Sequence, residues 1–193
     1  MPSQSRESSP RQLELLELAY EYVLQHGLTS FSLRPLAQAI GSSPRVLLFL
    51  FGSKEGLVHA LLGRARSSQL EILNQMPPTG SANDFASVVR GVWRWLHAKQ
   101  HRSMLGLWME TYARSLVEPD GPCAQFARKT VEDWLELLET RQPAAWRRSR
   151  AGIVERSLAL AVLRGALLDL LATGDEDRTT AIVEAYLNRV PEL

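Results

Sequence analysis

The stretch FSLRPLAQAIGSSPRVLLFLFGSKEGLVHALL, residues 31–62, carries the start and stop signals of consecutive short helices. Ser32 is a good N-cap for a helix of about eight residues, and Gly41 ends that helix. Ser43 caps a second helix and Pro44 stands at its first position, where a proline sacrifices no hydrogen bond. Two short helices joined by a tight turn that contains glycine form a helix-turn-helix, so the sequence predicts this motif.

Both short helices need support from their neighbours, because helices of this length are marginal on their own in water. Residues 11–26 predict a supporting helix, with Leu15 and Val23 on the face opposite to its glutamates. Ser53 caps a fourth helix that runs on to residue 75. The apolar side chains that we expect to hold the motif together are Leu36, Ala37, Ile40, Leu47 and Phe51.

The rest of the chain also has a helical pattern, and no stretch alternates apolar and polar residues as a strand does. Further helices are expected over residues 83–99, 103–117, 123–140, from 147 or 151 to 172, and 176–189. We therefore predict an all-α chain of about nine helices, with an N-terminal three-helix helix-turn-helix domain and a C-terminal helical bundle. The expected divisions are a disordered tail over 1–10, the helix-turn-helix domain over 11–52, a connecting helix over 53–75 and the bundle over 76–193.

Composition and charge limit the classes of protein. The 193 residues carry 22 Lys and Arg against 21 Asp and Glu, so the net charge is +1. Residues 1–66 hold seven basic and five acidic side chains, which is a weak electrostatic signal for a nucleic-acid binder. The single cysteine excludes an intramolecular disulfide and a zinc cluster built on cysteines. No apolar run approaches the ~20 residues of a membrane span and no signal peptide is seen, so we expect a cytoplasmic protein without a membrane partner.

At the helix-turn-helix the sequence resembles the tetracycline-repressor (TetR) family of bacterial regulators. The residues that match the family pattern are Leu36-Ala37, Gly41, Ser43, Leu47, Phe51 and Ser53-Lys54-Glu55. The resemblance implies a homodimer in which each subunit places the helix after Ser43 in a major groove of a double-stranded DNA operator. It also implies that the C-terminal bundle binds a small-molecule effector, which releases the DNA, and that the last two helices dimerise.

One departure from the family pattern lies in the middle of the second short helix. Most relatives carry a tyrosine, then polar or basic residues and a histidine there, whereas this sequence has Leu48, Phe49 and Leu50. Apolar side chains can contact thymine methyl groups, so DNA binding with few polar contacts is one interpretation. The other is an all-α sensor or protein-interaction module that kept the fold without binding DNA.

Cations and small polar residues around the motif are the expected DNA contacts. Arg45 stands near the N-terminus of the helix, the end from which a recognition helix contacts base edges. Lys54 begins the next helix, whose N-terminus attracts a phosphate group. Capping alone is sufficient to explain Ser43. The predicted DNA-binding residues are Arg34, Ser42, Ser43, Arg45, Leu48, Phe49 and Lys54.

Aromatic residues are concentrated in the middle helices, where large rings suit an apolar ligand pocket. Plain core packing is the alternative for each of them. The expected polar anchors are Arg94, Glu110 and Arg114. The predicted pocket residues are Trp93, Trp108, Met109, Tyr112, Phe126 and Trp134.

The last two helices provide the expected dimer interface. Residues 158–171 are apolar on more than one face, which is typical of a buried helix. The expected interface residues are Leu158, Val162, Gly165, Leu168, Ile182, Ala185 and Tyr186. The alternative is that these side chains serve only the core of one subunit.

No pattern in the sequence points to catalysis, a cofactor or a metal. There is no pairing of a nucleophile with a base and no glycine-rich phosphate loop. His97 and His101 stand one helical turn apart but lack a third ligand, and Cys123, at an expected helix start, leaves a redox switch as a minor alternative. We therefore expect a regulator and not an enzyme, most simply a repressor released by an apolar or amphipathic small molecule.

Overall fold

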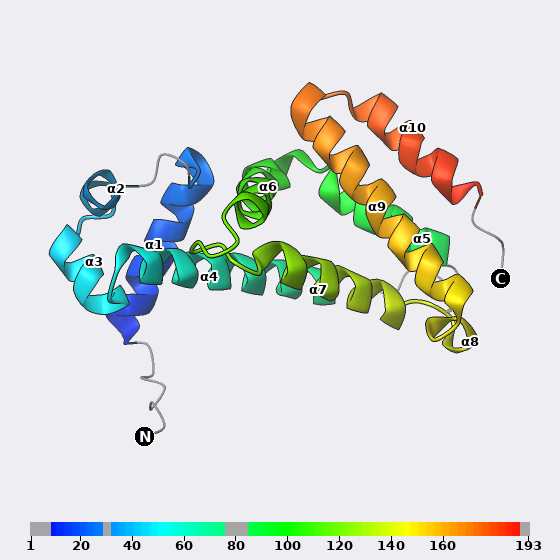
Figure 1. The fold of residues 1–193 in the computed structure, drawn as a ribbon. Helices are drawn as coiled ribbons and strands as arrows, with labels where there is room; N and C mark the ends of the chain where they lie inside the picture. Colours follow the sequence, from blue (N-terminus) through cyan, green and yellow to red (C-terminus); the bar gives the residue numbers. More distant parts are fainter. Residues whose placement is uncertain (1–8, 29–31, 76–84, 190–193) are drawn as a thin grey trace, which may run out of the picture.

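The computed structural model describes residues 9–28, 32–75 and 85–189, and all regular structure within these ranges is helical. The elements, drawn in Figure 1, are α1 (Pro10–His26), α2 (Leu33–Ala39), α3 (Pro44–Phe51), α4 (Lys54–Gln75), α5 (Phe85–Leu96), the 3-10 helix η1 (Lys99–His101), α6 (Arg102–Val117), α7 (Phe126–Thr140), α8 (Ala144–Arg147), α9 (Arg150–Thr173) and α10 (Glu176–Leu187). The predicted all-α class is confirmed. Across these ranges no single helix is long and apolar enough to cross a membrane.

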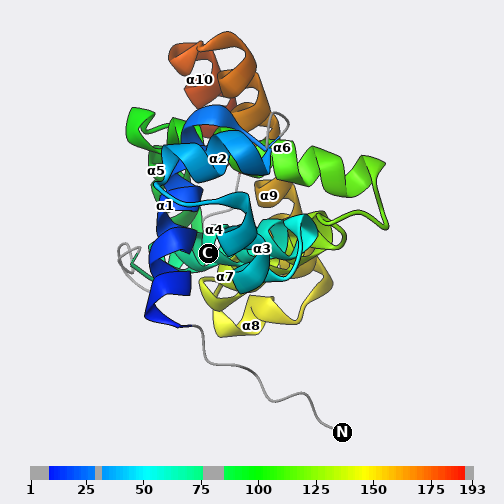
Figure 2. The ribbon, with the colours of Figure 1, turned by 90° about the vertical axis from the view of Figure 1, so that its left-hand side faces the viewer.

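Helices α1, α2 and α3 form one end of the molecule, as Figures 1 and 2 show. Leu15, Leu36 and Leu47, one from each helix, are fully buried and make the core of this end. Gly41 turns the chain between α2 and α3 with a φ of +62°, a conformation that favours glycine. The backbone N–H of Ser42 donates to the carbonyl of Ala37 over 2.8 Å and fixes the same turn. The predicted helix-turn-helix is therefore present.

Helix α4 links this end to the rest of the chain and runs alongside α7 (Figure 1). The guanidinium of Arg66 on α4 makes two hydrogen bonds, of 2.7 and 2.9 Å, to the carboxylate of Asp133 on α7. Arg64, two residues earlier, pairs with Glu17 on α1. The two hydrogen bonds between Arg66 and Asp133 fix both the position and the orientation of the two side chains. Together with the pair of Arg64 and Glu17, they connect α4 to both parts of the molecule.

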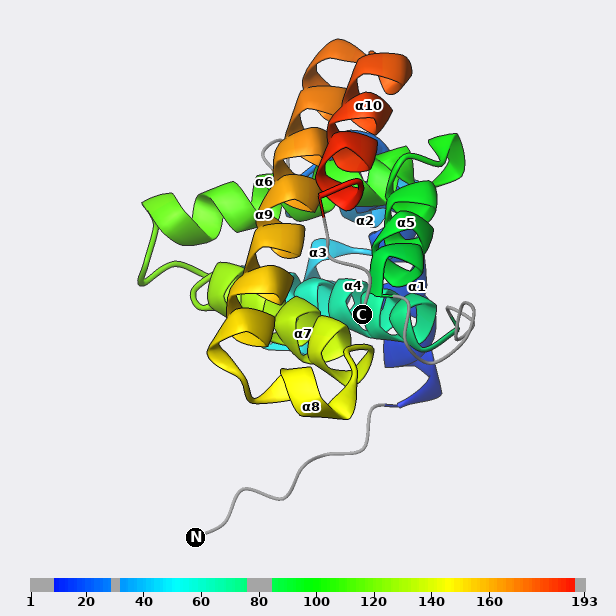
Figure 3. The same cartoon turned by 90° about the vertical axis from the view of Figure 1, so that its right-hand side faces the viewer.

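Helices α9 and α10 lie side by side at the end of the molecule opposite to α3 (Figures 1 and 3). Ser149 caps α9 by accepting from the N–H of Gly152, and Asp175 caps α10 by accepting from the N–H of Arg178. One continuous apolar core runs from the N-terminal helices through α5, α6 and α7 to this pair.

The largest difference from the sequence prediction lies at the end of α5. The sequence predicts this helix over 83–99, but it ends at Leu96. Ring nitrogens of His97 and His101 lie 2.9 and 2.8 Å from the carbonyl oxygens of Trp93 and Trp95, and each ring also stacks on the indole concerned. These side chains satisfy carbonyls at the helix end, which lets the backbone leave the helix early.

Other boundaries shift for local reasons. α7 starts at Phe126 and not at residue 123, because Gln125 takes a left-handed φ of +65° that no helix can contain. α8 is a short helix that the prediction lacks. Ser9 caps α1 and Pro10 begins it, so the predicted tail over 1–10 includes two ordered positions. The rest of that tail, 1–8, and the predicted bundle segments 76–84 and 190–193 lie outside the described residues.

Candidate functional site

Helix α3 presents one face to the core and the opposite face to solvent. Ser43 starts the helix by accepting a hydrogen bond from the N–H of Val46 over 3.3 Å, and Leu47 is fully buried. On the other side Arg45 is exposed, Leu48 is 40% exposed and Phe49 is 85% exposed. Leu48 and Phe49, two of the predicted DNA contacts, thus lie on the accessible side of the helix. The helix therefore offers an accessible surface with an apolar centre.

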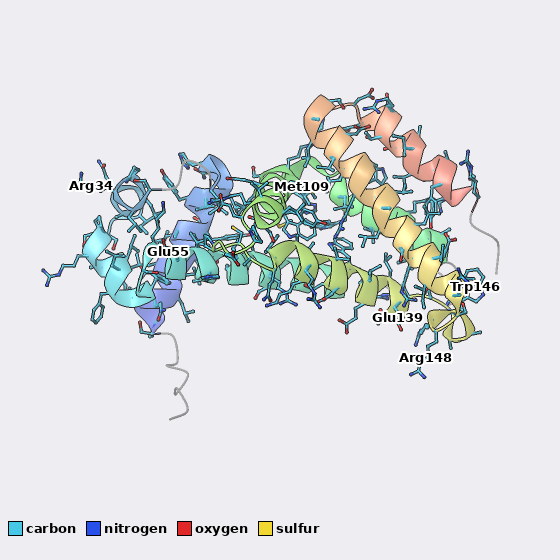
Figure 4. The ribbon with its side chains drawn as sticks, in the orientation of Figure 1. Arg34, Glu55, Met109, Glu139, Trp146 and Arg148 are labelled. Carbon is cyan, nitrogen blue, oxygen red and sulfur yellow. The ribbon has the colours of Figure 1, made fainter. Side chains whose placement is uncertain are left out.

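Two exposed cations lie close to α3 in the chain. Arg34 extends from α2 at the outer tip of this end of the molecule, as Figure 4 shows. Lys54 is exposed at the first residue of α4. Its neighbour Glu55 accepts hydrogen bonds from the backbone and from Ser53, and these bonds, with the charge of Lys54, lower the pKa of that carboxyl. The carboxylate of Glu55 thus already occupies the N-terminus of α4, where the helix dipole favours negative charge. The positive charge of Lys54 offsets this carboxylate, which reduces its repulsion of an incoming anion.

The two serines of the turn are placed differently from each other. The hydroxyl oxygen of Ser42 is buried and has no hydrogen-bond partner in the part of the chain that the structure describes. Ser42 therefore does not present its hydroxyl to a ligand at the surface, because the turn folds that side chain inward. Ser43 is partly exposed, but its oxygen already caps α3.

A cavity of about 350 Å³ lies in the C-terminal bundle between α6, α7 and α9. Its lining is formed by Leu96, Trp108, Met109, Tyr112, Thr130, Trp134, Leu160, Leu163, Arg164 and Leu167. Four of the six predicted pocket residues are brought together here, namely Trp108, Met109, Tyr112 and Trp134. Figure 4 shows Met109 on α6 in the middle of the molecule.

The other two predicted pocket residues lie elsewhere. Trp93 is fully buried and donates its indole N–H to the hydroxyl of Thr180 over 3.0 Å, so it joins α5 to α10 as part of the core. Phe126 lines a neighbouring cavity of about 320 Å³, which it shares with Trp108, Trp95 and Ala65 of α4. Trp108 therefore borders both cavities.

None of the three expected polar anchors lines the larger cavity. Arg94 is exposed, and Arg114 pairs with Glu118 one turn further along α6. Glu110 faces the N-terminal domain instead, where its carboxylate accepts from the N–H of Leu28 over 2.9 Å.

Arg164 is the polar residue of the cavity that the sequence pattern did not reveal. Its Nη1 donates to the hydroxyl of Tyr112 over 3.2 Å, and its guanidinium carbon lies 5.0 Å from the centre of that ring. Its Nη2 is buried without a hydrogen-bond partner among the described atoms, and burial lowers the pKa of the guanidinium. The one signal in the sequence is a single cation inside the apolar run LALAVLRGALL.

Most of the predicted dimer residues form an exposed face on α9 and α10. Leu158 and Leu168 are 47% and 54% exposed, and Ile182 is 39% exposed. Gly165 and Ala185 are exposed as well, while Val162 is half-buried against the core. Tyr186 is different, because it is buried and its hydroxyl bonds the carboxylate of Glu155 within the same chain. Burial raises the pKa of Tyr186. That residue belongs to the core of the subunit.

Cys123 does not have the setting of a reactive thiol. It is fully buried, and it precedes the start of α7 at Phe126 by three residues. Burial raises the pKa of the thiol, which reduces the thiolate that oxidation requires. The structure thus contradicts the redox alternative.

Residues 15–61 match the family model described as bacterial regulatory proteins, tetR family. This segment of the chain is therefore similar to the N-terminal domain of the tetR family. The match covers the helix-turn-helix and the first part of α4, which is the region that the capping and turn signals identified. The comparison with curated proteins gives no match.

Solved structures extend the likeness of fold to more than nine-tenths of the chain. The multidrug binding protein EbrR complexed with imidazole has a TM-score of 0.69 at 22% identity, with 99% of this chain and 97% of that chain covered. A transcriptional regulator from Rhodococcus gives 0.71 at 15% identity, with 91% and 93% covered. GusR from Salmonella enterica gives 0.62 at 17% identity, with 95% of each chain covered. At these identities the likeness establishes the fold.

Proposed function

We propose that this protein is a homodimeric, cytoplasmic repressor of the tetR family, which binds an operator in double-stranded DNA and releases it when a small molecule enters the bundle. The observation that carries the proposal is the outward face of α3 in a tetR-type domain, together with an apolar cavity some distance along the same chain. A recognition helix must be accessible to enter a major groove, and α3 meets that condition.

The contacts we propose follow from the position of each side chain. Arg45, near the N-terminus of α3, reads a base edge, and a good two-pronged contact to guanine is worth about 1–3 kcal/mol of discrimination. Arg34 and Lys54 contact phosphates on either side. Leu48 and Phe49 pack against thymine methyl groups, the contact that the major groove offers to apolar side chains.

The exposed face of α9 and α10 pairs two copies of the chain. It bears Leu158, Gly165 and Leu168 on α9 and Ile182 and Ala185 on α10. A cyclic dimer brings the same patch of both subunits together, which suits two helices per subunit packed as a four-helix bundle. Two copies of α3 then face two half-sites of one operator.

The effector acts by changing the distance between the two copies of α3. Tyr112 on α6 faces the cavity, while Glu110 on the same helix holds the N–H of Leu28 at the end of α1. Arg66 on α4 grips Asp133 on α7, next to Trp134 of the cavity wall. A ligand that binds better to one arrangement of α4 and α6 shifts the population towards it. EbrR, a multidrug binding protein solved in complex with imidazole and with proflavin, supports a small-molecule site on this fold.

The test is binding of the purified protein to the DNA upstream of its own gene over a series of salt concentrations. We expect log affinity to fall linearly with log salt, and Arg45→Ala and Lys54→Ala each to weaken binding. Lys129→Ala, which removes an exposed cation from α7, is the matched control and leaves affinity unchanged.

Unchanged affinity in both Arg45→Ala and Lys54→Ala contradicts the assigned contacts. A protein that binds no specific DNA site even at low salt contradicts the regulator itself, and favours an all-α sensor that uses the apolar face of α3 for another purpose.

A further inference from the structure

The cavity of the bundle contains a cation that has no anion. Arg164 has one neutral partner, the hydroxyl of Tyr112, and its Nη2 is buried without an acceptor. No carboxylate of the described ranges forms an ion pair with it, and none stands among the residues that line the cavity. Every other lining side chain except Thr130 and Tyr112 is apolar or an indole.

A half-buried cation such as Arg164 costs free energy unless an anion accompanies it. Arginine cannot escape the cost by losing its proton at neutral pH, because a guanidinium stays protonated in proteins. Burial lowers the pKa of Arg164, and only the neighbouring Tyr112 opposes that effect. The ring of Tyr112 stabilises the guanidinium only in part, since it lies 5.0 Å away and remains neutral. The site thus retains a strong, unused attraction for negative charge.

A second unused donor borders the same cavity. The indole Nε1 of Trp108 is buried and has no acceptor in the described part of the chain. Tryptophan offers a donor and no acceptor, so only a hydrogen-bond acceptor can satisfy it. Trp108 and Tyr112 stand one turn apart on α6 and share a helical face. Two residues of the largely apolar cavity wall, Trp108 and Arg164, therefore each carry a buried donor without an acceptor.

We propose that the cavity binds an amphipathic organic anion, with a carboxylate held by Arg164 and Trp108 and an apolar body among Leu160, Leu163 and Trp134. A carboxylate matches the planar fork of a guanidinium with two parallel hydrogen bonds. The apolar walls recognise the body of the ligand, and the two donors determine the sign of its charge. That this anion is the effector rests on the proposed function, whereas its binding to the cavity does not.

The experiment compares three probes that share one ring system: naphthoate, naphthalenemethanol and naphthylmethylamine. Calorimetric titration into the full-length protein should show that naphthoate binds at least about tenfold more tightly than the neutral and the cationic probe. In Arg164→Met the affinity for naphthoate should fall by about tenfold to a hundredfold, the value of hydrogen bonds to a charged group, while the affinity for the alcohol stays within about twofold.

Two further variants separate the charge from the shape of the cavity. Arg164→Lys keeps the charge but loses the fork, and it should bind naphthoate with intermediate affinity. Trp108→Phe removes one donor and should lower naphthoate affinity more than alcohol affinity. Trp134→Phe, the matched change across the cavity, should affect both probes equally. Arg164→Met should unfold at a temperature no lower than the parent protein, because it removes an unpaired buried charge.

The proposal is overturned if the amine or the alcohol binds as tightly as naphthoate, if none of the three binds, or if Arg164→Met leaves naphthoate affinity unchanged. The outcome is separable from the test of the regulator. Operator binding without a preference for the anion rejects this inference alone, and a preference for the anion without operator binding rejects the repressor alone.

Discussion

The two ends of the molecule each expose an apolar surface, and the surroundings of the two surfaces differ. On α3, Phe49 and Leu48 are flanked by Arg45 and by two further exposed cations, Arg34 and Lys54. The exposed face of α9 has no charged side chain along its length, and its members are Val154, Leu158, Ala161, Gly165, Leu168 and Ala172. An exposed apolar patch marks a contact surface, and the charge of the residues around the patch indicates which kind of partner binds there. The cations around the apolar surface of α3 suit a polyanion such as DNA. The uncharged face of α9, with its small residues, suits close packing against the same helix of a second copy.

The largest expected effect tests the α9 face. Leu168→Glu places a carboxylate at the middle of the proposed dimer interface, and the two-fold symmetry buries it twice. Since an unpaired buried charge costs several kcal/mol, we expect the dimer to weaken by about 5 kcal/mol or more and to run as a monomer. Sedimentation velocity measures the change. Lys129→Glu on α7 is the control for added negative charge. A dimer that survives Leu168→Glu would show that this face does not pair subunits.

The second prediction compares the two sides of α3. Leu47→Ala should lower the free energy of unfolding by about 2–5 kcal/mol, because it empties a fully buried position. Phe49→Ala should change it by less than about 0.5 kcal/mol, as is usual for surface positions. The same variant should weaken operator binding by about 1 kcal/mol, part of the value of burying an aromatic ring. Urea unfolding and DNA titration measure the two quantities. A large loss of stability in Phe49→Ala would mean that the ring serves the fold.

The smallest expected effect lies at the contact between the two regions. Glu110→Ala leaves the N–H of Leu28 without its partner and should lower the free energy of unfolding by about 1.5 kcal/mol. Glu110→Gln keeps an acceptor at the same place and should cost less than half as much. Thermal unfolding of both variants gives the comparison. Equal losses would show that charge, and not the hydrogen bond to Leu28, is what matters there.

The helix-turn-helix was predictable from sequence because its signals are local. Ser43 and Pro44 start α3, Gly41 turns the chain before it, and each acts within a few residues of its own position. The family resemblance lies in the same residues that the family model matches. The local signals do not decide which way the apolar middle of α3 faces, and the structure places Phe49 on the outside.

The cavity was predictable only in part, because it depends on contacts between residues far apart in the chain. Trp93 and Trp108 are both large aromatic residues of the middle helices, so the sequence predicts the same role for both. Trp93 instead lies in the core, where it donates a hydrogen bond to Thr180, 87 residues away. Arg164 meets Tyr112 across 52 residues, and no pattern around either residue announces the pair. The inward turn of the Ser42 hydroxyl is likewise decided by packing and not by the local sequence.

The indole rings of Trp108 and Trp134 lie with their centres 5.8 Å apart and their planes tilted by 46°. Chromophores at that separation and angle couple their electronic transitions, which gives the far-ultraviolet circular dichroism of the molecule a signed doublet. Both rings belong to the cavity wall, so any occupant that shifts one of them changes the doublet. We therefore expect binding in the cavity to change the circular dichroism of this indole pair.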